Sequence, residues 1–228
     1  MSAEPRFMDA QHRFSEAERE ALYRVIALRR DTRHFLPGQV LPEAQLLRLL
    51  QAFHQAPSVG LMQPWRLLRI RDAALRERLA ALVEAERQTT AAALGERGAE
   101  FLRLKVEGLR DCAELLALVQ PPDDGTVFGR RTLPREMALC SAGCAVQNLW
   151  LAARAEHLGL GWVSMFEPQP LAELLRLPEG AQALGLLCLG PVERFYEAPM
   201  LEQQGWRQGR RLDEMLMDNF WKNEPDGN

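Results

Sequence analysis

Residues 134–157 constrain the fold more than any other part of this chain. They predict one long helix whose middle has almost no polar face. The small and apolar residues that fill it are Ala138, Ala142, Ala145, Val146, Leu149 and Ala153. A helix that is apolar nearly all round must be covered on several sides. We therefore expect it to lie in a domain core or against another subunit.

The other predicted elements alternate between helices and short apolar strands. Helices are predicted over 15–30, where Ser15 and Glu18 form a capping box, and then over 42–55, 72–110 and 171–175. The segment 72–110 is interpreted as two helices joined near Gly95 and Gly98. Strands are predicted over 65–70, 115–119, 162–166 and 184–189. Gly159 and Gly161 are interpreted as the stop of the long helix.

This order of elements predicts a single α+β domain rather than a dinucleotide-binding unit. No G-x-G-x-x-G follows a predicted strand. With 228 residues, of which 47% are hydrophobic, the chain is long enough to bury a sizeable core. The polar residues 1–14 are expected to be an N-terminal extension, 15–198 the main domain and 199–228 a C-terminal extension.

Charge and composition disfavour several kinds of partner. The net charge of −3 gives no overall basic field for nucleic acid. The chain contains no run of 18 apolar residues, so no membrane span is predicted, and we expect a soluble, cytoplasmic protein. The four cysteines lack paired C-x-x-C spacing and are interpreted as small buried apolar residues; they are Cys112, Cys140, Cys144 and Cys188. No spaced histidine pattern occurs, so no metal is predicted.

Residues 29–35, R-R-D-T-R-H-F, concentrate charge at the end of the first predicted helix. Three arginines in five positions exceed what a helix terminus needs, which favours a multiply charged anion as ligand. Asp31 is the odd member, and among cations its carboxylate is expected to stay ionised near neutral pH. The alternative is a solvated turn in which Asp31 merely pairs with arginine.

Three separated segments together resemble the FMN-binding motifs of nitroreductase-like flavoproteins. They are residues 29–35, residues 57–65 (P-S-V-G-L-M-Q-P-W) and residues 159–164 (G-L-G-W-V-S). Within that superfamily they are most similar to the 5,6-dimethylbenzimidazole synthases, which fragment a flavin in cobalamin biosynthesis. Residues 144–154 add a further match, and the resemblance runs from about 15 to 221. One departure follows Gly108, where those enzymes carry an Ala-Pro pair and this chain does not.

The resemblance implies a nitroreductase-like fold, with a mixed or antiparallel sheet flanked by helices, and an FMN site. Arginines of the first segment would contact the phosphate and ribityl chain, and residues of the second segment the isoalloxazine edge. Arg207 is similar to a C-terminal basic residue that closes the phosphate pocket. The implied FMN-binding residues are Arg29, Arg30, Asp31, Thr32, Arg33, Ser58, Gly60, Met62, Gln63, Lys105, Ser164 and Arg207.

The resemblance also implies the reaction. Ordinary nitroreductases usually carry Ser where this chain has Asp31, so Asp31 places a proton acceptor beside the flavin. Asp31 and Ser164 are the implied catalytic residues for oxygen-dependent fragmentation of reduced FMN to 5,6-dimethylbenzimidazole and D-erythrose 4-phosphate. A separate flavin reductase would supply the reduced FMN. The alternatives are an NAD(P)H-dependent nitro- or quinone reductase and a non-catalytic flavin-binding protein.

The same family is usually a homodimer with flavin sites at the interface. The nearly all-apolar helix over 134–157 is consistent with such a pairing. The tail beyond 199 carries Trp206, Phe220 and Trp221, which is too much aromatic surface for a free tail. We expect this extension to dock on the body of the chain or on the partner subunit.

Overall fold

The computed structural model describes residues 13–123, 125 and 136–221. The chain forms two compact units, residues 1–197 and residues 198–228, and each is described by itself. The expected extension over 1–14 lies mostly outside the described residues.

A four-stranded antiparallel sheet forms the centre of the first unit. Its strands are β1 (Arg66–Arg69), β2 (Glu114–Gln120), β3 (Leu158–Val163) and β4 (Gln182–Pro191), in the order β1-β2-β4-β3. All seven residues of β2 are buried, as expected for an apolar strand covered on both faces. The register pairs Ala117 with Leu186 and Gly161 with Cys188, so β4 lies between β2 and β3.

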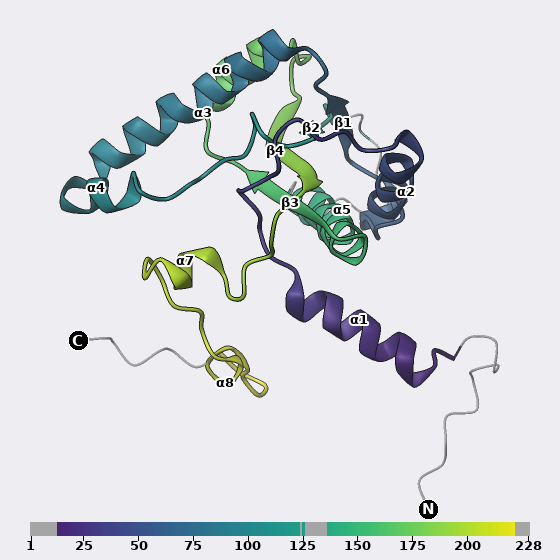
Figure 1. The fold of residues 1–228 in the computed structure, drawn as a ribbon. Coiled ribbons are helices and arrows are strands. Elements are labelled where there is room, and N and C mark those ends of the chain that lie inside the picture. The colour runs from purple at the N-terminus through teal and green to yellow at the C-terminus, as the bar shows by residue number, and fades with distance from the viewer. Residues whose placement is uncertain (1–12, 124, 126–135, 222–228) are drawn as a thin grey trace, which may run out of the picture. The chain divides into compact units, whose positions relative to one another are not determined.

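Helices cover both faces of this sheet, as Figure 1 shows. On one face α2 (Glu43–His54) and α5 (Glu136–Ala155) pack against Leu116, Leu118 and Leu160. On the other face α3 (Ala73–Ala93) and α6 (Pro168–Leu174) pack against Leu115, Ala117 and Leu186. Burial of these two apolar layers is the main stabilising contribution of the fold.

Shorter elements complete the first unit. Helix α1 (Glu16–Leu28) begins with the predicted capping box at Ser15 and Glu18, and it packs on α5 without burying any of its own residues. The 3-10 turns η2 (Val59–Leu61) and η3 (Gly95–Arg97) precede β1 and α4 (Gly98–Phe101), respectively. None of the helices in the described ranges is long and apolar enough to span a membrane.

Two sequence predictions about this unit are wrong. The second of the two helices predicted over 72–110 is much shorter than expected, because α4 ends at Phe101 and residues 102–110 form turns and loop, where the backbone at Gly108 packs closely on the Phe35 ring. The third strand begins at Leu158, earlier than predicted, so Gly159 and Gly161 lie inside β3 rather than ending a helix. The long helix instead ends at Ala155, and His157 turns the chain with a φ of 60°.

The cysteines divide into two pairs in the structure. Cys112 and Cys188 are buried, as predicted, but Cys140 and Cys144 are exposed on α5. They lie four residues apart, so they share the outward face of that helix. The described residues of one chain leave this face of α5 uncovered, so its predicted burial against another subunit stays a prediction.

The second unit contains two short helices, α7 (Met200–Gln203) and α8 (Leu212–Met215). Phe220 and Trp221 near its end are exposed, and Trp206 is half-buried. The docking of this extension on a partner stays a prediction.

Candidate functional site

The segment that carries the arginine cluster lies along the edge of the sheet. The backbone N–H of Thr32 donates to the carbonyl of Leu160 at 3.0 Å, and Asp31 forms an isolated parallel bridge with the same residue. A Cβ atom at Gly161 would lie 2.1 Å from the carbonyl oxygen of Thr32. Glycine in β3 is therefore required for this close approach.

Asp31 is held from two sides. Its Oδ1 accepts from Arg33 Nη1 at 2.7 Å and from the backbone N–H of Trp162 at 3.0 Å, and its Oδ2 lies 2.6 Å from Arg33 Nη2. Burial raises the pKa of this carboxyl, although Arg33 and the Trp162 N–H act in the opposite direction. The effect of burial therefore exceeds that of the arginines, and the expectation that Asp31 is ionised near neutral pH stays a prediction. The side chain is still 42% exposed, so a ligand can reach it.

The guanidinium and the backbone N–H of Arg33 hydrogen-bond to neighbouring groups of the same chain. Besides pairing with Asp31, its guanidinium donates to the carbonyl of Trp162 at 2.9 Å. Its backbone N–H donates to the hydroxyl of Tyr196, which also lies 2.5 Å from His34 Nδ1. Partial burial, followed by the charge of Lys105, lowers the pKa of His34. Tyr196 therefore organises this segment, and no motif in the sequence had pointed to it.

The other two arginines of the cluster differ in how they are used. Arg30 donates through Nη1 to the carbonyls of Ala27 and Arg29, at 2.7 Å each, and through Nη2 to the carbonyl of Glu197 at 2.9 Å. Its Nε is buried and has no hydrogen-bond partner among the described residues. The guanidinium of Arg29 lies 5.0 Å above the ring of Trp150 and makes no hydrogen bond to any described side chain. The N–H groups of the Arg29 guanidinium are therefore available to bind an anion.

Lys105 and Ser164 lie near the same segment. Lys105 sits in the turn region after α4, where its Nζ donates to Asp111 at 2.9 Å and its charge acts on His34. Ser164 follows β3 directly, two residues after the Trp162 N–H that bonds Asp31, and it is exposed. The structure thus places Lys105 near His34 and Ser164 just beyond the end of β3, but none of the described hydrogen bonds joins either residue to Asp31.

The loop over 58–63 is a separate, strained element. Its backbone has positive φ at Gly60 (55°), Leu61 (53°) and Gln63 (45°), which is unfavourable for the two larger residues. The hydroxyl of Ser58 accepts from the backbone N–H of Gln63 at 3.0 Å and so supports that conformation. Such strain in an ordered loop is typical of a binding element.

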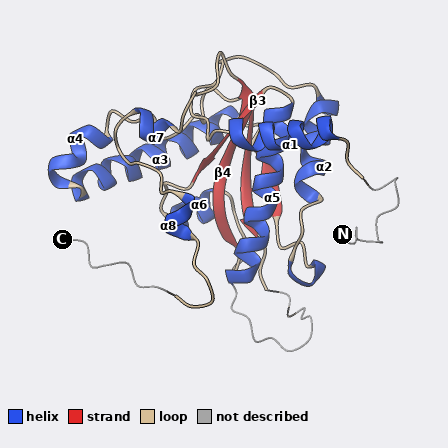
Figure 2. Cartoon of the chain, turned by 90° about the horizontal axis from the view of Figure 1, so that it is seen from below, coloured by secondary structure: helices blue, strands red, loops and turns tan. Residues whose placement is uncertain are grey.

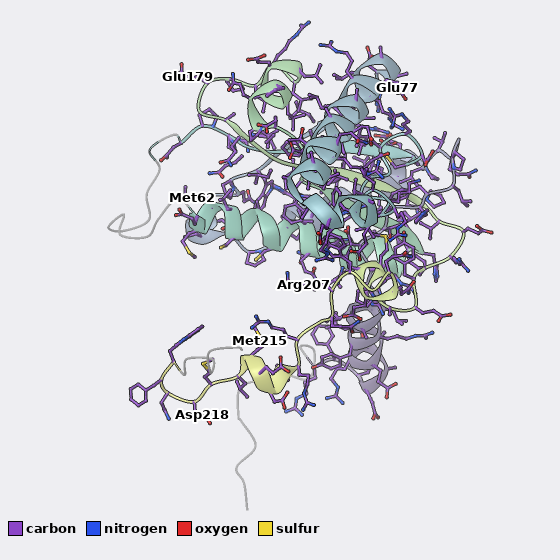
Figure 3. The ribbon with its side chains drawn as sticks, turned by 90° about the vertical axis from the view of Figure 1, so that its left-hand side faces the viewer. Met62, Glu77, Glu179, Arg207, Met215 and Asp218 are labelled. Carbon is purple, nitrogen blue, oxygen red and sulfur yellow. The ribbon has the colours of Figure 1, made fainter. Side chains whose placement is uncertain are left out.

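The loop over 58–63 and the arginine cluster contact α5 at two well-separated positions. Ser141 accepts from the backbone N–H of Val59 at 3.1 Å, whereas Arg154 donates to the carbonyl of Leu28 at 3.2 Å. Thirteen residues of helix separate these two anchor points, which corresponds to about 20 Å. Figure 2 shows α1 crossing one end of α5, and Figure 3 shows Met62 at the opposite end. One chain therefore does not bring Ser58, Gly60, Met62 and Gln63 next to Asp31.

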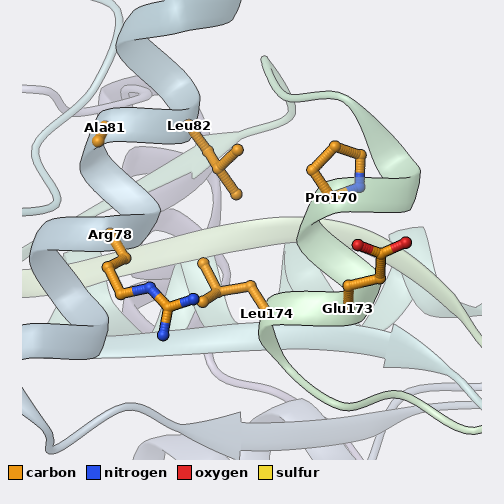
Figure 4. Close-up of a pocket in the computed structure, with 6 residues that line it drawn as sticks. All are labelled: Arg78, Ala81, Leu82, Pro170, Glu173 and Leu174. Atoms are coloured by element: carbon orange, nitrogen blue, oxygen red, sulfur yellow. The ribbon is translucent and has the colours of Figure 1, made fainter.

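Arg207 belongs to the second unit, where its backbone N–H donates to the carbonyl of Leu201, and its role stays a prediction. A groove of about 510 Å³ lies between α3 and α6 (Figure 4). Its lining contains no predicted site residue and consists of Arg78, Ala81, Leu82, Pro170, Glu173 and Leu174.

In the described ranges no group of three or more His, Cys, Asp or Glu side chains could hold a metal ion.

A family model described as the nitroreductase family matches residues 26–191 of this chain. The match spans the sheet, both helical layers and the Asp31 segment. The chain belongs to the nitroreductase family. This result confirms the predicted α+β, nitroreductase-like fold.

Curated relatives refine the assignment within that family. A 5,6-dimethylbenzimidazole synthase of Rhodobacter capsulatus is 36% identical over 86% of this chain and 95% of its own length. One of Rhodospirillum rubrum is also 36% identical, over 86% of this chain and 94% of its own length. These relatives confirm the resemblance seen in the motifs and show that the chain is an oxidoreductase enzyme.

Solved structures support the same fold. A BluB-like flavoprotein from Clostridium difficile 630 superposes with a TM-score of 0.67 and covers 88% of this chain and 99% of that one. At 18% sequence identity this likeness shows the fold alone.

Proposed function

We propose that this protein is a 5,6-dimethylbenzimidazole synthase that takes reduced FMN as its substrate and uses O2 to fragment it. D-Erythrose 4-phosphate would be the second product, and a separate flavin reductase would supply the reduced FMN in the cytoplasm. The observation that carries this proposal is the carboxylate of Asp31, held by Arg33 and the Trp162 N–H where a plain flavin reductase needs no proton acceptor. The two synthases at 36% identity support it.

The residues present fit a flavin nucleotide. Its phosphate is a dianion, and the unengaged guanidinium of Arg29 and the unpartnered Nε of Arg30 are donors that such a group satisfies. Lys105, whose charge acts on His34, and the exposed Ser164 after β3 are polar groups that the ring and ribityl hydroxyls could use as partners. When bound, reduced FMN supplies the electrons for O2 and the carbon atoms of the product.

The protein's own groups would move the proton and orient the ligand. Burial raises the pKa of Asp31 and makes its carboxylate a better proton acceptor than an ordinary surface aspartate. Arg33 fixes the direction of that carboxylate through two contacts. We assign Asp31 as the general base and Ser164 as a donor that orients the ligand.

A complete site would need two copies of the chain. The loop that carries Ser58, Gly60, Met62 and Gln63 is anchored about 20 Å along α5 from the arginine cluster of the same chain. A second copy packed on the exposed face of α5 would bring its loop to the first copy's Asp31. The exposure of Cys140 and Cys144 on that face is consistent with such a cover. We therefore propose a homodimer in which each flavin contacts both subunits.

The decisive experiment is a product assay. Purified protein and chemically reduced FMN are mixed with air, and the products are identified by mass spectrometry. We expect 5,6-dimethylbenzimidazole from the wild type and none from Asp31→Asn, which should still bind FMN. An active Asp31→Asn variant would refute the proton-transfer role of that residue.

The same preparation separates the alternatives. A nitro- or quinone reductase would oxidise NAD(P)H directly and leave the flavin intact. A flavin-binding protein without activity would bind reduced FMN and protect it in air. Either result, with no 5,6-dimethylbenzimidazole formed, would overturn the proposal.

A further inference from the structure

Arg154 lies in the last turn of α5, at the same end as the arginine cluster. Its Nε donates to the carbonyl of Leu28 at 3.2 Å, and its guanidinium carbon lies 3.9 Å from the centroid of the Phe195 ring. One turn earlier on the same helix, Trp150 carries the guanidinium of Arg29 at 5.0 Å. Two guanidiniums, each stacked on an aromatic ring, therefore stand at one end of α5.

These cations lie beyond ion-pair distance of every described acidic side chain, although the charge of Arg29 still acts on Asp31. No described acidic side chain forms an ion pair with Arg24, Arg29, Arg30 or Arg154. Burial, together with the charges of Arg24 and Arg30, lowers the pKa of Arg154. A group of like charges that is not neutralised within the chain destabilises the fold unless an anion binds there.

The stacking also prepares the two side chains for an anion. The indole N–H of Trp150 donates to the carbonyl of Leu160 at 2.7 Å, so the ring beneath Arg29 is fixed to the sheet. Arg154 is fixed by Phe195 and by the carbonyl of Leu28, which engages only its Nε. Both guanidiniums therefore keep terminal N–H groups for a ligand and lose little side-chain entropy when one binds.

We propose that Arg154 and Arg29 together bind the phosphate of the flavin nucleotide, and that Arg30 positions them. Arg30 uses its terminal nitrogens on the carbonyls of Ala27, Arg29 and Glu197, which ties the end of α1 to the residues before the second unit. The inference rests on the proposed function, because it takes a flavin nucleotide as the ligand. It assigns to Arg154 a selectivity for the phosphorylated over the unphosphorylated flavin.

The test compares two ligands that differ only in the phosphate. Dissociation constants of oxidised FMN and riboflavin are measured by fluorescence titration for the wild type and for Arg154→Gln. Loss of charge-assisted hydrogen bonds should weaken FMN binding roughly 10- to 100-fold and leave riboflavin binding unchanged. Arg154→Lys keeps the charge but not the planar guanidinium, so its affinity for FMN should lie between those of the wild type and Arg154→Gln.

Arg48→Gln serves as the matched control. Arg48 pairs with Glu156 near the same end of α5 but lies outside the cationic group, so its loss should not change the ratio of the two affinities. If Arg154→Gln weakens FMN and riboflavin equally, Arg154 has only a structural role and the inference is overturned. If the wild type binds neither oxidised flavin, nor reduced FMN in an anaerobic titration, the proposed function itself fails.

Discussion

Arg33 and Asp31 meet at two points, with 2.7 Å between Nη1 and Oδ1 and 2.6 Å between Nη2 and Oδ2. The pair lies at the edge of β3, and the N–H of Trp162 completes the set of donors to the carboxylate. This geometry fixes the position of the Asp31 carboxylate, and the two sets of donors oppose the effect of burial, which raises the pKa of Asp31.

Replacing Arg33 should change the pH dependence of the reaction. Arg33 lowers the pKa of Asp31, so Arg33→Gln should raise it further above the ordinary value of 3.8. Since the base must be ionised, activity is lost as the pH falls through this pKa, and the acid side of the profile should move to higher pH. The measurement is the pH profile of kcat/KM for product formation. The profile of Arg33→Lys, which keeps the charge, should shift less. Identical profiles for the wild type and Arg33→Gln would show that Asp31 is not the titrating group.

A methyl group at Gly161 should separate the Asp31 segment from the sheet. The added Cβ would lie 2.1 Å from the carbonyl of Thr32 and 2.7 Å from Arg33 Nη1, so the segment must move. We expect Gly161→Ala to destabilise the fold by about 1–3 kcal/mol and to weaken flavin binding. Chemical denaturation and flavin titration measure the two effects. Unchanged binding would mean that the close packing on β3 does not shape the site.

The sequence predicted much of this arrangement but not the role of each glycine and arginine. The apolar runs predicted all four strands, and the capping box predicted the start of α1. Gly159 and Gly161 were misinterpreted because local sequence does not reveal that Thr32, far away along the chain, needs the space above them. The second helix predicted within 72–110 ends early, at Phe101, and a tertiary contact at Gly108 that local sequence does not reveal accompanies the turns that follow.

Within the site, the sequence motifs predicted which residues are charged but not which groups those residues contact. Spacing alone could not show that Arg33 pairs with Asp31 while the guanidinium of Arg29 stacks on Trp150, because both contacts depend on tertiary packing. Arg154 lay in a segment noted only for its family resemblance, and its position beside Arg29 follows from the packing of α1 on α5. Tyr196 carried no sequence signal.

A site shared between two copies predicts complementation between two defective variants. Arg29→Gln should damage the phosphate end, and Gly60→Val should damage the loop, where φ is 55° and a β-branched residue is strained. Each homodimer should then be inactive. Mixing them through unfolding and refolding should restore about a quarter of the sites, because each mixed dimer has one site in which both contributions are wild type. No recovery, despite mixed dimers seen by native mass spectrometry, would place both elements in one subunit's site.

Pairing through α5 should also protect two thiols that are exposed on a single chain. Cys140 and Cys144 lie on the outward face of that helix, so a second copy packed there should slow their reaction with a maleimide. Leu151, seven residues beyond Cys144, lies on the same face, and Leu151→Arg should place like charges together, separate the copies and speed the labelling. Cys112 and Cys188 are buried within the chain and should react slowly in both proteins, which makes them an internal control. Fast labelling of Cys140 and Cys144 in a wild-type protein that light scattering shows to be dimeric would place the contact between copies elsewhere.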